Sequence, residues 1–150
     1  MELLEEIARR LGGRLGLVGR DDGTLRIPAE APRYGPVQIR IEHDAEAAAI
    51  RVAVPLTPPS GAGPDFLLWC LAVSAQYFHV KVGLDDEGML LIHADIDADE
   101  DAGPAWLTDA VVERAETILE LLDDDLVPFL LGRSLGTAQQ RARWQGPFSP

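Results

Sequence analysis

A serine near the C-terminal end of the chain lies in a pattern that is typical of hydrolases. Residues 132–136 read G-x-S-x-G, which in α/β-hydrolases places a serine nucleophile on a strand-to-helix turn. That chemistry needs an aspartate and then a histidine later in the chain, but all three histidines precede Ser134. The residues before Gly132 have the spacing of a helix, so we interpret the two glycines as a helix stop and predict no serine catalysis.

Closely spaced carboxylates suggest a second chemistry, the binding of Ca²⁺. Asp95, Asp97 and Asp99 resemble the start of an EF-hand loop, which needs glycine at its sixth position and glutamate at its twelfth. Glu100 and Trp106 stand at those positions, so the loop is incomplete. Weak binding of Ca²⁺ or Mg²⁺ by the many carboxylates stays open, and a solvated acidic turn is the simpler interpretation.

Two histidines that lie apart in the sequence can meet in space. His79 and His93 can come near each other on the polar face of one predicted hairpin, close to Lys81 and Asp95. A surface histidine pair is the simpler interpretation, since no cysteine or second acid accompanies them. The alternative is an uncharacterised enzyme or a metal-dependent sensor that uses His79, His93 and Asp95. We predict no bound metal and no cofactor, and no phosphate-binding glycine loop occurs.

The acidic residues are concentrated in one part of the chain. Residues 85–125 contain fifteen Asp and Glu against one Arg, a balance of 1 − 15 = −14, whereas the whole chain has a net charge of −12. A nucleic-acid-binding protein would carry a basic surface instead. The charge distribution therefore indicates a surface that meets a cationic partner and argues against direct binding of nucleic acid.

The hydrophobic periodicity predicts an α+β fold in the order α-β-β-β-α-β-β-α. Because the strands come as hairpins, we expect a mostly antiparallel sheet with helices packed on one face. Helices are expected from about residue 3 to 11, from 64 to 78, and from Pro104 until Pro128 breaks or kinks the last one. Strands are expected near residues 24–28, 37–42, 50–56, 80–84 and 90–96.

The turns of the two hairpins set the partners of their strands. A type I turn over Asp86 to Gly88, with the glycine in the left-handed conformation, pairs Val82 with Ile92 and Lys81 with His93. The same register would place His79 opposite Asp95. A four-residue turn over residues 44–47 would place Arg40 directly opposite Arg51, which is unfavourable without a nearby acid.

The second predicted helix is apolar on nearly every side. Its sequence DFLLWCLAVSAQYF leaves no polar face, so in a small domain one side can pack on the sheet and the other needs a further cover. The most economical cover is a second copy of the chain. We therefore predict a homodimer with Leu67, Trp69 and Leu71 at its interface, although one sequence does not settle which face points inward. Cys70 is expected to act as a small buried hydrophobe.

The third predicted helix carries an acidic stripe, for which three interpretations stay open. Binding of a basic partner segment would use Asp109, Glu113, Glu116 and Glu120. The stripe can instead serve only solubility. It can also be covered by the arginines of the C-terminal tail, which are Arg133, Arg141 and Arg143.

The outer face of the predicted sheet is a second candidate surface for a partner. Arg40, Arg51, Lys81, Met89 and Leu91 would share it with the two hairpin histidines, which gives a mixed cationic and apolar patch. Extended peptides bind to surfaces of this kind.

One segment carries a resemblance to a known family. Residues 82–99, VGLDDEGMLLIHADIDAD, and the helix that starts near Trp106 resemble the YbjN-like proteins of bacteria, whose fold is similar to that of type III secretion chaperones. The resemblance covers residues 77–131 best. It implies a homodimeric, non-enzymatic α+β protein that binds a segment of another protein.

Together these features predict one domain over residues 1–150, with a tail from about residue 132 whose order the sequence leaves open. The acidic, amphipathic N-terminus and the short apolar stretches predict a cytoplasmic protein with no membrane segment. We expect it to be an acidic dimeric adaptor, with no catalytic activity, that binds another bacterial protein. A nucleic-acid-binding protein with a basic segment would be a suitable partner.

Overall fold

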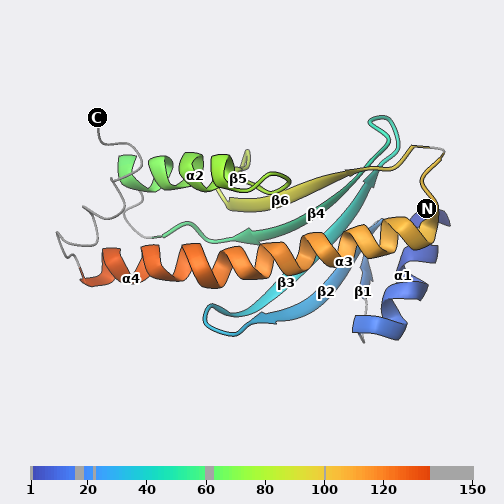
Figure 1. Cartoon of the computed structure of the whole chain (residues 1–150), viewed down its shortest axis with the longest axis horizontal. Helices are drawn as coiled ribbons and strands as arrows, with labels where there is room; N and C mark the ends of the chain where they lie inside the picture. Colours follow the sequence, from blue (N-terminus) through green and yellow to red (C-terminus); the bar gives the residue numbers. More distant parts are fainter. Residues whose placement is uncertain (1, 16–18, 22, 60–62, 100, 136–150) are drawn as a thin grey trace.

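The computed structural model describes residues 2–15, 19–21, 23–59, 63–99 and 101–135. Its elements are α1 (Glu2–Leu15), β1 (Gly19–Asp21), β2 (Thr24–Ala31), β3 (Gly35–Asp44), β4 (Ala49–Leu56), α2 (Pro64–Gln76), β5 (Lys81–Leu84), β6 (Leu90–Asp97), α3 (Pro104–Leu121), a π-helical turn η1 (Leu122–Leu126) and α4 (Val127–Leu135) (Figure 1). The predicted α+β class and element order are confirmed. The short strand β1 is an addition ahead of the first predicted strand.

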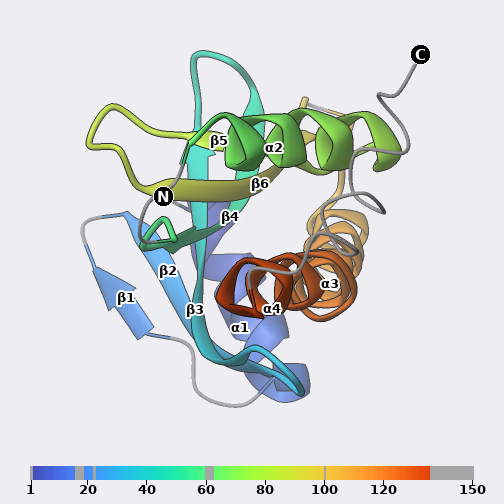
Figure 2. The ribbon, with the colours of Figure 1, turned by 90° about the vertical axis from the view of Figure 1, so that its left-hand side faces the viewer.

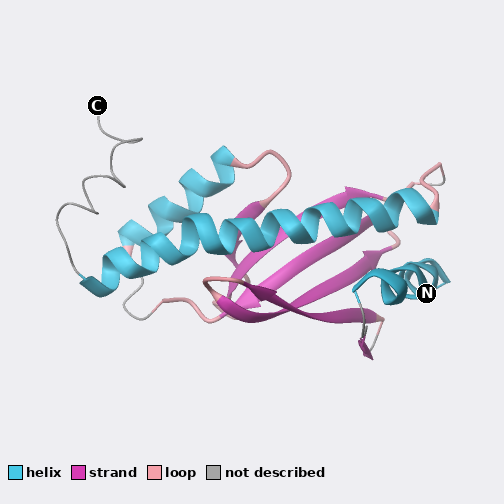
Figure 3. Cartoon of the chain, turned by 60° about the horizontal axis from the view of Figure 1, so that its bottom comes forward, coloured by secondary structure: helices cyan, strands magenta, loops and turns pink. Residues whose placement is uncertain are grey.

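The strands form one sheet in the order β1-β2-β3-β4-β6-β5, and every neighbouring pair is antiparallel. Buried and less buried residues alternate along β6, as expected for a sheet with one covered face. The helices α1, α3 and α4 lie on one side of the sheet (Figure 2). The continuous helix of α3, η1 and α4 crosses that face (Figure 3). The opposite face of the sheet is called the outer face below.

The helix α2 packs beside the edge strand β5 and is joined to the rest of the core by aromatic rings. Trp69 is completely buried, its ring stacks on Phe66 with centroids 5.8 Å apart, and it lies 5.5 Å from the ring of Phe129 in α4. Contacts of this kind contribute beyond the burial of area alone. The three rings therefore attach α2 to the far end of the long helix.

A serine of α2 also covers the free edge of the sheet. The Ser74 hydroxyl accepts a hydrogen bond from the Val82 N–H at 2.8 Å and donates one to the Val82 carbonyl at 3.2 Å. Both backbone groups belong to the outermost strand, where unpaired groups would otherwise be open to pairing with another chain. Ser74 thus pairs the free backbone groups of Val82 at the β5 edge within the molecule.

The hairpin β5–β6 has the predicted register. Val82 pairs with Ile92 and Lys81 pairs with His93, and Gly88 has φ = 81° in the turn. However, β5 begins at Lys81, so His79 lies outside the ladder and the prediction that it faces Asp95 is wrong.

The hairpin β3–β4 differs from the prediction by one residue in its turn. Asp44 pairs with Ala49, so the turn comprises residues 45–48, and Ala48 takes a positive φ of 49°. Moving a four-residue turn by one position changes each partner by two residues, which keeps every side chain on its predicted face. Arg51 consequently lies opposite Glu42, and the predicted Arg40–Arg51 pair is wrong.

The last helix continues past Pro128 and Gly132, so the predicted break at Pro128 and the predicted stop at Gly132 are wrong. A π turn does interrupt the α-helix just before Pro128, and Gly136, the second glycine of the predicted stop, lies outside the described residues. The N–H of Val127 bonds to the carbonyl of Leu122, five residues earlier, and α4 then runs to Leu135 (Figure 1). Proline lacks an N–H and its ring clashes with the carbonyl four residues before it in an α-helix. The π turn contains Asp124, whose carbonyl the Pro128 ring would meet in a regular α-helix, and we attribute the continuation of the helix to this local widening.

Candidate binding surfaces

The outer side of α2 is an exposed apolar surface. Leu67, Leu68 and Leu71 are 51%, 40% and 65% exposed, whereas Phe66, Trp69, Cys70 and Val73 are buried. The buried set follows the spacing i, i+3, i+4, i+7 of one helix face. The structure therefore places Leu67 and Leu71 where the predicted interface needs them. It corrects the assignment of Trp69, whose side chain fills the core of its own chain and has no surface left for a partner.

The only cysteine is an unreactive core residue. Cys70 is 6% exposed, and burial raises the pKa of its thiol to about 11. Since the thiolate is the nucleophilic form, the thiol is inert near neutral pH. The expected role as a small hydrophobe fits this environment.

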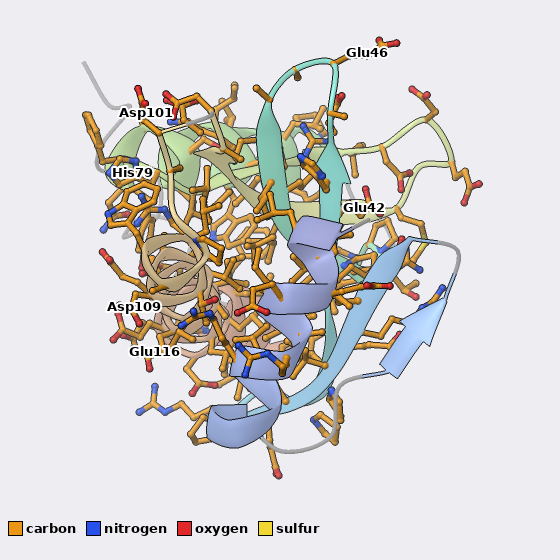
Figure 4. The ribbon with its side chains drawn as sticks, turned by 90° about the vertical axis from the view of Figure 1, so that its right-hand side faces the viewer. Glu42, Glu46, His79, Asp101, Asp109 and Glu116 are labelled. Atoms are coloured by element: carbon orange, nitrogen blue, oxygen red, sulfur yellow. The ribbon has the colours of Figure 1, made fainter. Side chains whose placement is uncertain are left out.

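The predicted acidic stripe is a continuous surface on α3. Asp109, Glu113, Glu116 and Glu120 are all exposed along one side of the helix, and Figure 4 shows Asp109 and Glu116 projecting from it. Trp106, which is 57% exposed, lies at the start of the same stripe. The four acidic residues thus form an exposed surface, and their role in partner binding stays a prediction.

The aspartates of η1 have a different task, which sequence reasoning missed. One Asp123 carboxylate oxygen accepts hydrogen bonds from the backbone N–H groups of Arg33 and Tyr34 at 2.8 and 2.9 Å, so it holds the β2–β3 turn against the long helix. Asp125 accepts a hydrogen bond from the Tyr77 hydroxyl, next to α2. Burial and this carboxylate raise the pKa of Tyr77. No sequence signal indicates such contacts, because their partners lie far away along the chain.

The outer face of the sheet is organised in rows that the register defines. The first row contains Glu42, Arg51 and Asp95 on β3, β4 and β6. Arg51 donates to both oxygens of Asp95, at 2.8 and 3.2 Å. This contact is the main reason why the pKa of Asp95 is lowered. The charges of Arg51 and Asp95 therefore offset each other. Glu42 lies on the opposite side of the molecule from Asp109 and Glu116 (Figure 4).

The next row is dominated by basic side chains. Arg26, Arg40, Ala53, His93 and Lys81 follow one another across β2, β3, β4, β6 and β5; we call this set the basic row. The Lys81 ammonium donates to the carbonyl of Ser74 at 3.0 Å. Burial lowers the pKa of His93, and Arg51 adds to this effect while Asp95 opposes it.

The third row is neutral. It consists of Pro28, Gln38, Pro55, Leu91 and Gly83. The predicted partner residues Arg40, Arg51, Lys81 and Leu91 thus share one face, and Met89 lies directly before β6.

The predicted histidine site is not brought together. His79 is exposed after α2, and its ring makes an edge contact with the ring of Phe78, with centroids 4.6 Å apart. His93 instead lies in the basic row, with its Nδ1 3.9 Å from an oxygen of Asp95. Within the part of the chain that the structure describes, no group of three or more His, Cys, Asp or Glu side chains could hold a metal ion. The metal-dependent alternative therefore has no geometric support in these residues.

The G-x-S-x-G pattern also lacks its required context. Its first four residues belong to α4, so a helix leads into Ser134 where a hydrolase needs a strand.

Across the described ranges, no helix is long and apolar enough to cross a membrane.

Comparisons with known proteins identify the fold. No protein-family model and no curated protein sequence matches this chain. The crystal structure of YbjN from E. coli matches with a TM-score of 0.66 and 15% identity, over 90% of this chain and 92% of that chain. A chain of the ExsC–ExsE complex matches with a TM-score of 0.59 and 14% identity, over 81% and 91%. A chain of the HopA1–SchA chaperone–effector complex matches with a TM-score of 0.54 and 18% identity, over 79% and 88%. The predicted resemblance is thus confirmed for the fold, which is YbjN-like and similar to that of type III secretion chaperones.

Proposed function

We propose that this protein is a non-enzymatic, chaperone-like adaptor of the cytoplasm, which forms a homodimer and binds a segment of another protein. The observation that carries the proposal is the outer side of α2, where three leucines are exposed on a fold shared with a chaperone–effector complex. Fold and surface together support the proposal.

The dimer would use the outer side of α2. Leu67 and Leu71 are one helical turn apart and Leu68 lies beside them, which forms a contiguous apolar patch. Contiguous exposed apolar surface is typical of interaction sites. A twofold contact would place the same patch of both copies against each other, so that one set of leucines covers the other.

The acidic stripe on α3 would bind a basic segment of the partner. Asp109 and Glu113, and also Glu116 and Glu120, are like charges four residues apart, and each such pair destabilises a helix by about 0.2–0.5 kcal/mol. In the described part of the chain the one basic residue of α3 is Arg114, which contacts Glu113 at 3.3 Å. A cationic segment would offset this repulsion, and Trp106 offers an apolar contact at the end of the stripe.

The outer face of the sheet would contact an extended segment of the same partner. Arg40, Lys81 and Leu91 point to this face, Arg51 lies there in its ion pair with Asp95, and Met89 lies beside them at the β5–β6 turn. The two surfaces lie on opposite sides of the molecule and differ in sign of charge.

Affinity capture from the native cell tests the binding role. We expect the wild-type protein to retain a basic protein at low salt and to release it as salt rises, because exposed charges are screened within about 10 Å at 0.1 M. The variant Glu113→Lys, Glu116→Lys, Glu120→Lys should lose that partner. A matched triple reversal of the exposed residues Glu46, Asp86 and Glu87 should keep it.

The same experiment can contradict the proposal. If both triple variants retain the same proteins as the wild type, the stripe serves solubility alone. If both lose the partner equally, only net charge matters and the stripe is not a binding site.

A further inference from the structure

We infer that the basic row on the outer face of the sheet binds an acidic segment of a partner protein in an extended conformation. The inference rests on the proposed protein-binding role and adds the chemistry of the bound segment. It also reverses the expectation from net charge, since a protein with a net charge of −12 would here attract carboxylates.

None of the five residues that define the basic row is an acid, and the neighbouring Asp95 is already paired with Arg51. Asp95 is bound by Arg51 through two hydrogen bonds, and Glu42 lies opposite Arg51 in the sheet. In the described part of the chain, Arg40 forms no ion pair or hydrogen bond through its guanidinium, and its Nε is buried without a partner. That nitrogen has lost hydration without gaining a hydrogen-bond partner.

A second buried nitrogen lies two strands away in the same row. The Nδ1 of His93 is buried and has no hydrogen-bond partner in the described part of the chain. Ala53, which is 5% exposed, is the residue between Arg40 and His93. Unpaired buried polar atoms are uncommon in native proteins, and a water molecule, an ion or a ligand can supply the partner. A carboxylate above Ala53 would pair with Arg40 after a small rotation of its side chain and would accept a hydrogen bond from His93.

The size of the row indicates a peptide segment with several carboxylates. Five neighbouring strands at about 4.8 Å spacing give a row of about 19 Å from Arg26 to Lys81. An extended chain repeats the same side-chain direction about every 6.6 Å, so three acidic side chains on alternate residues span most of this length. The neutral third row, with Leu91 and Pro55, would accept apolar residues of the same segment.

The surroundings favour a short acidic peptide over a nucleic acid. Asp44 ends β3 and Glu46 lies in the following turn, and the turn β5–β6 carries Asp85, Asp86 and Glu87. A longer polyanion would extend from the row onto these acids and would be repelled.

Direct titration of the full chain with labelled peptides tests the inference. The probe is a fluorescein-labelled nonapeptide of alternating Thr and Glu, with a matched peptide in which Gln replaces Glu and a single-stranded oligonucleotide of nine thymidines. By fluorescence anisotropy at low salt, we expect the Glu peptide to bind at least about tenfold more tightly than the Gln peptide and the oligonucleotide, as for charge-assisted contacts. The side-chain Nε–H signal of Arg40 in a ¹⁵N NMR spectrum should shift during the same titration.

Variants separate the row from general electrostatics. Arg40→Gln should weaken binding of the Glu peptide about tenfold, Arg40→Lys should restore part of it, and Arg9→Gln on α1 should have no effect although it changes the net charge equally. Any of three results would overturn the inference. They are equal binding of the Glu and Gln peptides, tighter binding of the oligonucleotide than of the Glu peptide, and equal losses of Glu-peptide affinity in the Arg40 and Arg9 variants. A protein that still captures its basic partner but ignores the Glu peptide refutes this inference and leaves the proposed function intact.

Discussion

Both sides of α2 are apolar, but only one of them is covered within the chain. Its inner side places Phe66, Trp69 and Val73 in the core, while its outer side leaves Leu67 and Leu71 in contact with solvent. A helix with apolar residues on every side has no sequence signal for which side is which. An exposed leucine and a buried tryptophan two residues apart therefore test different properties, the proposed association and the folding of the chain.

The largest contrast is expected between two truncations in α2. Trp69→Ala removes a completely buried ring that packs on Phe66 and Phe129, so we expect it to lower the free energy of unfolding by about 3–5 kcal/mol. Leu71→Ala, at 65% exposure, should change the stability of the isolated chain by less than about 0.5 kcal/mol. Urea denaturation of both variants checks this, and similar losses would mean that the inner and outer sides are wrongly assigned.

The aspartates of η1 extend the comparison from apolar to acidic residues. Asp123→Ala leaves two backbone N–H groups of the β2–β3 turn without their acceptor, so we expect a loss of about 1–3 kcal/mol. Its neighbour Asp124 is exposed, and Asp124→Ala should be neutral. Thermal unfolding of the two variants decides whether Asp123 stabilises the fold or is only a solvated surface residue. Equal melting temperatures of the two variants would refute the contact between Asp123 and the β2–β3 turn.

The cover of the β5 edge should have a smaller effect. Ser74→Ala removes the hydroxyl that bonds to both backbone groups of Val82, so we expect a loss of about 1 kcal/mol and faster hydrogen exchange at the Val82 N–H. Thr117→Ala is the control, because the Thr117 hydroxyl donates only to the Glu113 carbonyl of its own helix, four residues earlier. Unchanged exchange at Val82 would show that water replaces the serine without cost.

The smallest effect is a dependence of stability on pH that comes from His93. Burial lowers the pKa of His93 in the folded state, with Arg51 acting in the same direction and Asp95 in the opposite one, so the unfolded chain binds the proton more readily. Its contribution to stability is therefore full above the unfolded pKa of about 6.5 and is lost as the pH falls from that value through the lower pKa of the folded state. Urea midpoints between pH 7.5 and 5.5 should fall more for the wild type than for His93→Gln, and parallel curves would contradict the burial effect.

Residue patterning predicted most of the sheet because a period of two survives small errors in a turn. Ile39, Ile41, Val52 and Ile92 lie inward as predicted, even though the turn between β3 and β4 is displaced by one residue. The partner of Arg51 was wrong for the same reason, since cross-strand pairing depends on the turn itself.

The contacts between distant segments could not be predicted from spacing. Three features depend on how α2, the β2–β3 hairpin and the long helix meet in space. They are the inward direction of Trp69, the contact from Asp123 to the β2–β3 turn and the continuation of the helix past Pro128. The predicted role of Arg133, Arg141 and Arg143 lies outside the described residues or side chains and stays a prediction.

Sedimentation velocity at micromolar concentration tests the central claim that the outer side of α2 is covered by a second copy. We expect the wild-type chain to sediment as a dimer. The double variant Leu67→Glu, Leu71→Glu should sediment as a folded monomer, because the dimer would bury unpaired negative charges in its interface. Trp106→Glu, an equally exposed site in the first turn of α3 at the opposite end of the molecule, should remain a dimer (Figure 1). A wild-type chain that sediments as a monomer, or a leucine variant that remains a dimer, would contradict the account.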